Sequence, residues 1–238
     1  MTFSSTSPDP FSGLRVAITG GTAGLGLALV RELVNRGARV AFVARTRGRV
    51  EQVMRDIPTA HGIVGDVSAK EDIYPIAIQI TGELGGLDVL INNASDLGPT
   101  PLPMLSDTEC EDLEQVFATN VFGPFRLTKA LMGALAASAR EGRGAVVLNV
   151  SSDAAVNPYP GWGAYGSSKA ALHHMSRIWD EEHTAEGVRF LSLDPGDMDT
   201  PMHAAAIPDA DTATLKRPEQ AAHEFLDQIS RMVKNDSR

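Results

Sequence analysis

Short apolar runs rich in β-branched residues alternate along this chain with longer stretches of helical periodicity. Runs such as Val89–Ile91 and Ala145–Leu148 are apolar throughout, which is typical of strands in a parallel sheet that is covered on both faces. The alternation therefore predicts a doubly wound α/β fold with one parallel sheet of about six strands. The expected strands are Arg15–Thr19, Arg39–Val43, His61–Gly65, Asp88–Asn92, Ala145–Val150 and Val188–Leu193.

Helical periodicity fills the intervals between these runs. The expected helices are Leu25–Asn35, Arg47–Asp56, Ala69–Gly82, Cys110–Ala139, Gly163–Glu182 and Pro218–Val233. Residues 1–13 are rich in Ser and Pro, and we expect a flexible lead-in there. With no internal repeat or linker, residues 14–238 are expected to form a single domain.

Composition excludes several classes of function. No apolar run approaches the roughly 20 residues that span a bilayer, and the net charge of −9 disfavours nucleic acid and anionic membranes as partners. A lone cysteine, Cys110, rules out an internal disulfide framework and fits a cytoplasmic setting. The pair His173-His174 and His183 do not form a ligand motif with an acid, so no metal site is expected.

A glycine-rich turn follows the first expected strand, at Thr19–Gly26. Gly20 permits a sharp exit from the strand, Gly24 lets backbone N–H groups approach a pyrophosphate, and Gly26 lets the helix pack closely. The start of the following helix favours an anion through its free N–H groups and its dipole. The position of this turn favours a nucleotide site over a plain turn.

The end of the second strand reads Ala44-Arg45-Thr46-Arg47 and holds no carboxylate. An Asp or Glu in this region would hold the ribose 2′-hydroxyl of NAD, whereas an arginine can hold a 2′-phosphate. The sequence thus favours NADP(H), bound through Arg45, with NAD(H) as the alternative cofactor. The alternative for Arg45 itself is a solvated surface arginine with no role in binding.

Tyr165 and Lys169 stand four residues apart at the start of a helical stretch, so both side chains lie on one helix face. A phenol has a pKa near 10. We expect the neighbouring ammonium and the helix N-terminus to lower the pKa of Tyr165, so that it exchanges a proton with an alcohol or carbonyl oxygen.

Together, the glycine loop, Tyr165, Lys169 and Ser151-Ser152 resemble the short-chain dehydrogenase/reductase family over about residues 14–230. Further ordered segments match the family motifs: Gly65-Asp66-Val67, Asn92-Asn93-Ala94, Asn120, and Pro195-Gly196 with Thr200 and Pro201. The resemblance implies a Rossmann-like fold. It also implies a set of cofactor-binding residues besides Arg45, Tyr165 and Lys169, namely Gly20, Thr22, Ala23, Gly24, Leu25, Gly26, Asp66, Val67, Asn93, Ala94, Ser95, Pro195, Gly196, Asp197, Met198 and Thr200.

The resemblance also implies catalytic roles for four residues. The family spacing of thirteen residues before the tyrosine selects Ser152, which would hydrogen-bond the substrate oxygen. Tyr165 would donate the proton in reduction, Lys169 would bind the nicotinamide ribose and lower the pKa of Tyr165, and Asn120 would hold a water molecule. The expected reaction interconverts a ketone or aldehyde and an alcohol. A sensor or scaffold that binds the dinucleotide without turnover is the alternative.

Two departures from the family pattern stand out. Ser95 replaces the glycine of the Asn-Asn-Ala-Gly motif, which puts a hydroxyl near the expected nicotinamide ribose. The chain also carries no segment resembling the family's seventh strand. The resemblance implies a homodimer formed by the helices at Cys110–Ala139 and Gly163–Glu182, with a tetramer as a further possibility.

The substrate pocket is expected between the segments Ser95–Pro103, Asp153–Trp162 and Asp197–Arg217. Trp162 and Tyr159 could stack on a flat ring, and Asp96 and Asp153 could hydrogen-bond amino groups. Local similarity to sepiapterin-type pteridine reductases suggests one alternative substrate. The expected lining residues are Asp96, Leu97, Asp153, Tyr159, Trp162 and Met202.

Overall fold

The computed structural model describes residues 9–235, and their centre is one sheet of parallel strands. The strand order is β3-β2-β1-β4-β5-β6, which confirms the predicted doubly wound sheet; no seventh strand occurs within residues 9–235. The strands are β1 (Arg15–Thr19), β2 (Arg39–Ala44), β3 (His61–Val64), β4 (Val89–Asn92), β5 (Ala145–Val150) and β6 (Val188–Leu193).

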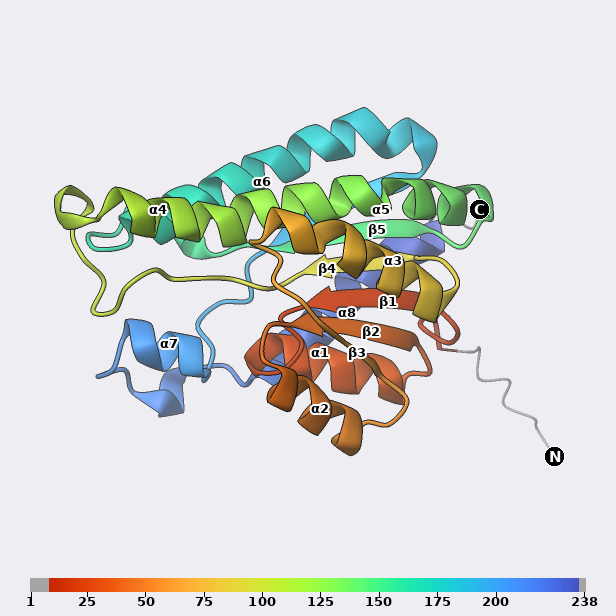
Figure 1. The fold of residues 1–238 in the computed structure, drawn as a ribbon, viewed down its shortest axis with the longest axis horizontal. Coiled ribbons are helices and arrows are strands. Elements are labelled where there is room, and N and C mark those ends of the chain that lie inside the picture. The colour runs from red at the N-terminus through yellow and green to blue at the C-terminus, as the bar shows by residue number, and fades with distance from the viewer. Residues whose placement is uncertain (1–8, 236–238) are drawn as a thin grey trace.

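Helices cover both faces of the sheet, as Figure 1 shows. One layer holds α1 (Gly24–Asn35), α2 (Arg47–Asp56) and α8 (Pro218–Asn235), and the other holds α3 (Ile73–Leu84), α5 (Gly123–Arg140) and α6 (Gly163–His183). Successive strand residues point to opposite layers, so Val16 and Ile18 enter one core while Ala17 enters the other. The continuous apolar runs are explained by this double burial.

The long helix expected at Cys110–Ala139 is interrupted. It consists of α4 (Cys110–Phe117), a π-helical turn (Ala118–Phe122) and α5. In the turn, the N–H of Gly123 donates to the carbonyl of Ala118. A π turn inserts one residue into the helical ladder and is frequent at functional sites, and this one contains Asn120.

The lead-in expected over residues 1–13 is packed where the structure describes it; residues 1–8 lie outside the described part. Phe11 is fully buried in the core beside Leu14. Asp9 accepts a 2.9 Å bond from Arg36, whose guanidinium lies over the Phe11 ring. Burial of one aromatic ring therefore anchors residues 9–13, a contact that a Ser/Pro-rich composition does not reveal.

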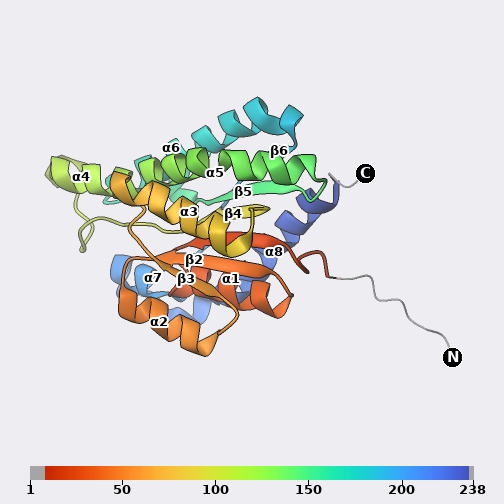
Figure 2. The ribbon, with the colours of Figure 1, turned by 45° about the vertical axis from the view of Figure 1, so that its right-hand side comes forward.

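The order of the strands reverses between β1 and β4. In doubly wound sheets, ligands bind in the crevice outside the carboxyl ends of the strands at this point. Both views place α4 and the short helix α7 (Pro201–Ala206) at the same end of the molecule (Figures 1 and 2). None of the helices within residues 9–235 is long and apolar enough to span a membrane.

Candidate active site

Two adjoining cavities open at the carboxyl ends of the strands. The first, of about 370 Å³, runs from the glycine loop past the ends of β2 and β3 to Lys169. The second, of about 340 Å³, lies between Ser152, Trp162 and α7. Tyr165 lines both cavities. A ligand bound in the first cavity would therefore meet a ligand bound in the second cavity beside Tyr165.

The glycine loop forms one end of the first cavity. Gly20 and Gly24 have φ angles of +73° and +50°, which an L side chain rarely adopts. Helix α1 begins at Gly24, and its N-cap residue Ala23 offers no side-chain hydrogen bond to the first turn. No side-chain cap therefore occupies the first N–H groups of α1, and their binding of an anion stays a prediction.

Hydrogen bonds between the end of β4 and the end of β1 fix the conformation of this loop. The Asn93 amide donates to the carbonyls of Thr19 and Gly20 at 2.9 and 3.2 Å, and Thr19 Oγ1 accepts from the backbone N–H groups of Asn93 and Ala94. A Cβ on Gly26 would collide with the Gly20 carbonyl and the Asn93 amide. Gly26 therefore packs under the loop instead of lining the cavity.

Two arginines line the first cavity beyond β2. Arg45 is exposed, with a guanidinium nitrogen 4.0 Å from Asp66 Oδ2, and Arg49 lies in the first turn of α2. We did not single out Arg49 as a binding residue from the sequence, although it stands with Arg45 and Arg47 in a basic run at the start of a helix, which gives the signal. Together the arginines form a cationic end of the cavity.

Most of the cofactor-binding residues expected from the sequence lie together in the first cavity. Gly196 and Asp197 instead line the second cavity. The expected residues found in the first cavity are Gly20, Thr22, Ala23, Gly24, Leu25, Arg45, Asp66, Val67, Asn93, Ala94, Ser95, Tyr165, Lys169, Pro195, Met198 and Thr200.

Tyr165 and Lys169 lie on one face of α6, and both are buried. The Lys169 Nζ is 5.5 Å from the centre of the Tyr165 ring and donates to the carbonyl of Val150, the last residue of β5, at 2.8 Å. The ammonium thus lies beside the ring, as the spacing predicts, with its position fixed by the sheet.

The expectation that the pKa of Tyr165 is lowered is wrong. Burial raises the pKa of Tyr165 to about 12, assisted by the charges of Asp194 and Asp153 and opposed by hydrogen bonds with Ser152 and Ser95. Burial also lowers the pKa of the Lys169 ammonium to about 8. The phenol is therefore protonated at neutral pH and can give a proton.

Ser152 follows β5 and lines the second cavity together with Tyr165. Its own hydroxyl donates to Asp153 at 3.2 Å and accepts from the N–H of Ala154. Asp153 also accepts a 2.8 Å bond from the Tyr159 hydroxyl. Tyr159, Asp153 and Ser152 thus form a hydrogen-bonded chain along one wall of the second cavity.

Asn120 is fully buried and its side-chain amide is saturated. The amide oxygen accepts from Asp96 N–H at 2.8 Å and from the Ser95 hydroxyl at 3.2 Å, while its nitrogen donates to Asp96 O and Ser168 Oγ. An amide offers two donors and two acceptor positions. The side-chain amide is therefore fully used in clamping the loop after β4, and the expectation that Asn120 holds a water molecule stays a prediction.

The second cavity contains five of the six expected substrate-lining residues, namely Leu97, Asp153, Tyr159, Trp162 and Met202. Asp96 is the exception, because its carboxylate accepts from Gly98 N–H within its own loop. Asp194 and His203 also line the cavity. Asp194 directly follows β6, so the rule that ligands bind at the carboxyl ends of parallel strands could have identified it from the sequence. His203 lies on α7, a helix that the sequence pattern did not predict. Residues 9–235 contain no cluster of three or more potential metal ligands.

Comparisons with known proteins agree on one family. The family model described as short chain dehydrogenase matches residues 15–211. An uncharacterized oxidoreductase of Mycobacterium tuberculosis is 32% identical over 93% of this chain, and the match covers 65% of that protein. The chain thus spans about two thirds of the length of this curated relative.

Solved structures share the fold. A 3-ketoacyl-(acyl-carrier-protein) reductase from Brucella melitensis, complexed with NADH, superimposes with a TM-score of 0.85 over 92% of this chain and 93% of its own, at 24% identity. An alcohol dehydrogenase from Thermococcus sibiricus, complexed with 5-hydroxy-NADP, gives a TM-score of 0.79 over 91% and 90%, at 26% identity.

Proposed function

This chain belongs to the short-chain dehydrogenase family, and on that premise we propose that it is an oxidoreductase that interconverts a small ketone or aldehyde and the corresponding alcohol with NADP(H). The observation that carries the proposal is the position of Tyr165, where the two cavities meet with Ser152 and Lys169 beside it. Mere binding of a dinucleotide requires neither hydroxyl at that junction.

The first cavity fits a dinucleotide. Free N–H groups at the start of α1 suit the pyrophosphate, and Lys169 lies at the far end, where we expect the nicotinamide ribose. When bound, the nicotinamide supplies or accepts the hydride. Arg45 and Arg49 support a preference for NADP(H), because paired guanidinium bonds suit a 2′-phosphate.

In reduction, the side chains of the chain itself handle the carbonyl oxygen. Ser152 hydrogen-bonds that oxygen and Tyr165 donates its proton to it as negative charge develops there. Its protonated state at neutral pH suits this direction. The nearby ammonium of Lys169 stabilises the phenolate left behind.

The charges that line the second cavity limit the kinds of substrate it can accept. Its lining includes Asp153, Asp194 and Asp197, and among the described residues that line it there is no lysine or arginine. A carboxylate or phosphate on the substrate would be repelled, whereas a neutral or amine-bearing ring could lie against Tyr159 and Trp162. We therefore place small uncharged or cationic carbonyl compounds first among the substrates.

The test is NADPH oxidation against a panel of aromatic ketones and aldehydes that are matched in size but carry neutral, amino or carboxylate groups. We expect Tyr165→Phe to lower kcat about 10³-fold, while Tyr74→Phe, on the exposed face of α3, leaves it unchanged. Equal rates for wild type and Tyr165→Phe would refute the role of Tyr165. NADPH binding without any turnover would favour the sensor alternative.

Cofactor preference has its own test. Arg45→Asp is expected to weaken NADPH binding about tenfold or more, with little effect on NADH, because one charge-assisted partner of the 2′-phosphate is lost. Arg47→Asp is the matched control, since Arg47 does not line the cavity. Equal weakening of both cofactors by Arg45→Asp would refute the assignment.

We also propose a homodimer formed through α5 and α6. Phe122, the last residue of the π turn, Phe125 on α5 and Ile178 on α6 are each more than a third exposed, and large exposed apolar side chains suit an interface. Sedimentation of the wild type and of Phe125→Glu tests this: a monomeric wild type would refute it.

A further inference from the structure

A third hollow, which we call the outer groove, adjoins the second cavity. It measures about 460 Å³ and is bordered by residues 154–163, by the loop before α4 and by the start of α6. Ala154, Tyr159 and Trp162 line both the outer groove and the second cavity. The two hollows therefore meet along these three side chains.

The lining of the outer groove is apolar. Met104, Leu105, Val156 and Tyr159 all line it, and each is more than two fifths exposed. The Ser167 hydroxyl donates to carbonyls of its own helical turn. Among the described residues that line the groove there is no aspartate, glutamate, lysine, arginine or histidine. Large exposed apolar side chains that gather in one hollow mark a binding site.

The walls of the outer groove are held in place. The Tyr159 hydroxyl donates to Asp153 at 2.8 Å, and the backbone N–H of Trp162 donates to the Tyr159 carbonyl at 3.2 Å. A Cβ on Gly163 would lie 2.6 Å from Leu105 Cδ1, so the loop before α4 packs directly on the start of α6. A hollow with fixed walls is typical of a ligand site, because such sites are largely preformed.

The position of the groove indicates what occupies it. The Trp162 ring contacts the Tyr165 ring edge-on, with 5.7 Å between the ring centres, so an aromatic wall leads from Tyr165 to the groove. A substituent on a carbonyl group bound beside Tyr165 would extend along this wall. Hollows of roughly 300–1,000 Å³ take small molecules, whereas a protein partner usually covers about 800 Å² of surface.

We propose that the outer groove binds the apolar substituent of the carbonyl substrate, an alkyl or aryl chain whose carbonyl end lies at Ser152 and Tyr165. This inference rests on the proposed oxidoreductase function and adds the substrate class: ketones or aldehydes that carry an uncharged apolar chain. The aspartates of the second cavity lie on the carbonyl side of Tyr159 and Trp162, and the chain lies beyond them.

The kinetic test uses NADPH and the 2-alkanones from 2-butanone to 2-decanone. We expect kcat/KM to rise about two- to fourfold for each methylene group that reaches the groove, because each is removed from water. Val156→Asp places a charge on the wall of the groove only. It should lower kcat/KM for 2-decanone at least tenfold and leave 2-butanone, which stays within the second cavity, at the wild-type rate.

Ile78→Asp is the matched control. Ile78 on α3 is 69% exposed against 72% for Val156, and it lines none of the three hollows. Equal rates of the two variants with 2-decanone would overturn the proposal, as would wild-type rates that do not change with chain length. The proposal also fails if Val156→Asp alone lowers the mass measured by sedimentation, because a second copy of the chain would then cover the groove.

A binding measurement separates this inference from the proposed function. The chain has two tryptophans, Trp162 and Trp179, so the fluorescence of Trp179→Phe reports Trp162 alone. The 2-alkanones are titrated in the presence of NADP⁺, which cannot reduce them. Affinity should rise with chain length, and adding Val156→Asp to Trp179→Phe should remove the rise.

The two possible failures then differ. A rise in affinity without any NADPH oxidation would retain the groove and refute the oxidoreductase function. Reduction of 2-butanone together with an affinity that is independent of chain length would refute the groove and leave the oxidoreductase function standing.

Discussion

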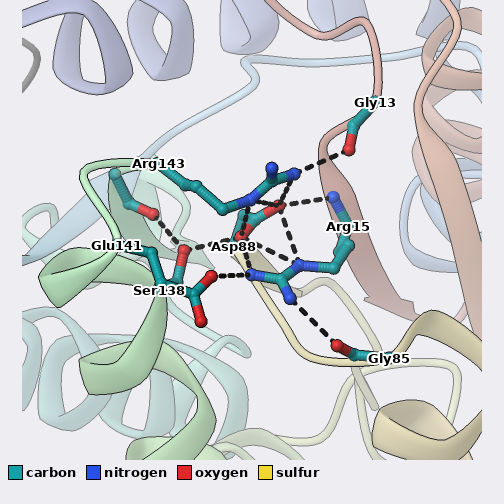
Figure 3. A network of polar contacts seen from close by, with 8 residues as sticks. Gly13, Arg15, Gly85, Asp88, Ser138, Glu141 and Arg143 are labelled. Atoms are coloured by element: carbon teal, nitrogen blue, oxygen red, sulfur yellow. Dashed lines mark hydrogen bonds and ion pairs between the residues drawn. The ribbon is translucent and has the colours of Figure 1, made fainter.

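Two buried charges lie at opposite edges of the sheet and are satisfied in opposite ways. Asp88, just before β4 at the amino ends of the strands, is fully buried and accepts bonds from Arg15, Arg143 and Ser138 (Figure 3). Lys169, at the carboxyl ends, is also buried, and its ammonium donates to one neutral carbonyl, that of Val150.

The difference appears in the pKa values. Burial alone would raise the pKa of Asp88, but hydrogen bonds from Arg15, Arg143 and Ser138 lower it overall. Burial lowers the pKa of Lys169 to about 8 because no carboxylate is close enough to oppose it. The first charge is stabilised by the fold, whereas the second destabilises the fold and is kept where the proposed chemistry needs a cation.

The Asp88 cluster also joins distant parts of the chain. Arg15 begins β1 and bonds the Gly85 carbonyl, and Arg143, between α5 and β5, bonds the carbonyl of Gly13. The amino edge of the sheet is therefore locked, while the carboxyl edge keeps its cavities. Changes at the two edges should affect different properties.

The largest stability effect is expected at Asp88. Asp88→Asn removes the charge that two arginines share, and we expect the free energy of unfolding to fall by about 3 kcal/mol. Urea unfolding monitored by circular dichroism measures it. NADPH affinity of the folded variant should stay within twofold of wild type; a stability loss below about 0.5 kcal/mol would contradict a structural role.

Acid should remove the same contribution. Because the folded pKa of Asp88 is lowered, its stabilisation is present above the unfolded value of about 3.9 and is lost as pH falls through the folded value. The stability difference between wild type and Asp88→Asn should therefore shrink below pH 4.

An opposite change is expected at Lys169. Lys169→Met removes a buried cation, whose lowered pKa corresponds to roughly 3 kcal/mol at neutral pH. It also leaves the Val150 carbonyl unpaired, at about 1 kcal/mol. We expect a net gain of about 2 kcal/mol in unfolding free energy at pH 7, together with loss of carbonyl reduction.

The pH dependence of that gain gives its control. Between about pH 8 and the unfolded value of about 10.4, unfolded Lys169 binds more protons than folded Lys169, so wild-type stability receives a rising contribution across this window. Lys169→Met should lack that rise. A destabilised variant with an unchanged pH profile would show that the ammonium is not desolvated.

The smallest effect is expected at Glu141, which belongs to the Asp88 cluster but is 57% exposed. Its carboxylate is solvated and lies 3.4 Å from the Arg15 guanidinium, so Glu141→Gln should change the unfolding free energy by less than about 0.5 kcal/mol. Thermal melts at low and high salt measure it. A loss as large as that of Asp88→Asn would mean that burial does not separate the two carboxylates.

Much of the fold was predictable because its signals are local. The bounds of β1, β5, β6 and α2 agree with the apolar runs and helical periodicity, and the spacing of Tyr165 and Lys169 placed both on one face of α6. The π turn at Asn120 and the helix α7 were missed, since neither interrupts the residue pattern in a way that periodicity detects.

The sequence by itself determined the succession of strands and helices along the chain, the glycine loop and the placing of a phenol beside an amine, because each depends on residues close together in the chain. Only the tertiary structure decided that the pKa of Tyr165 is raised and not lowered, that the amide of Asn120 is saturated, and that Asp88 is ion-paired while Lys169 is not. The physical reason is that desolvation and hydrogen bonding depend on segments tens of residues apart, which meet only when the sheet has formed.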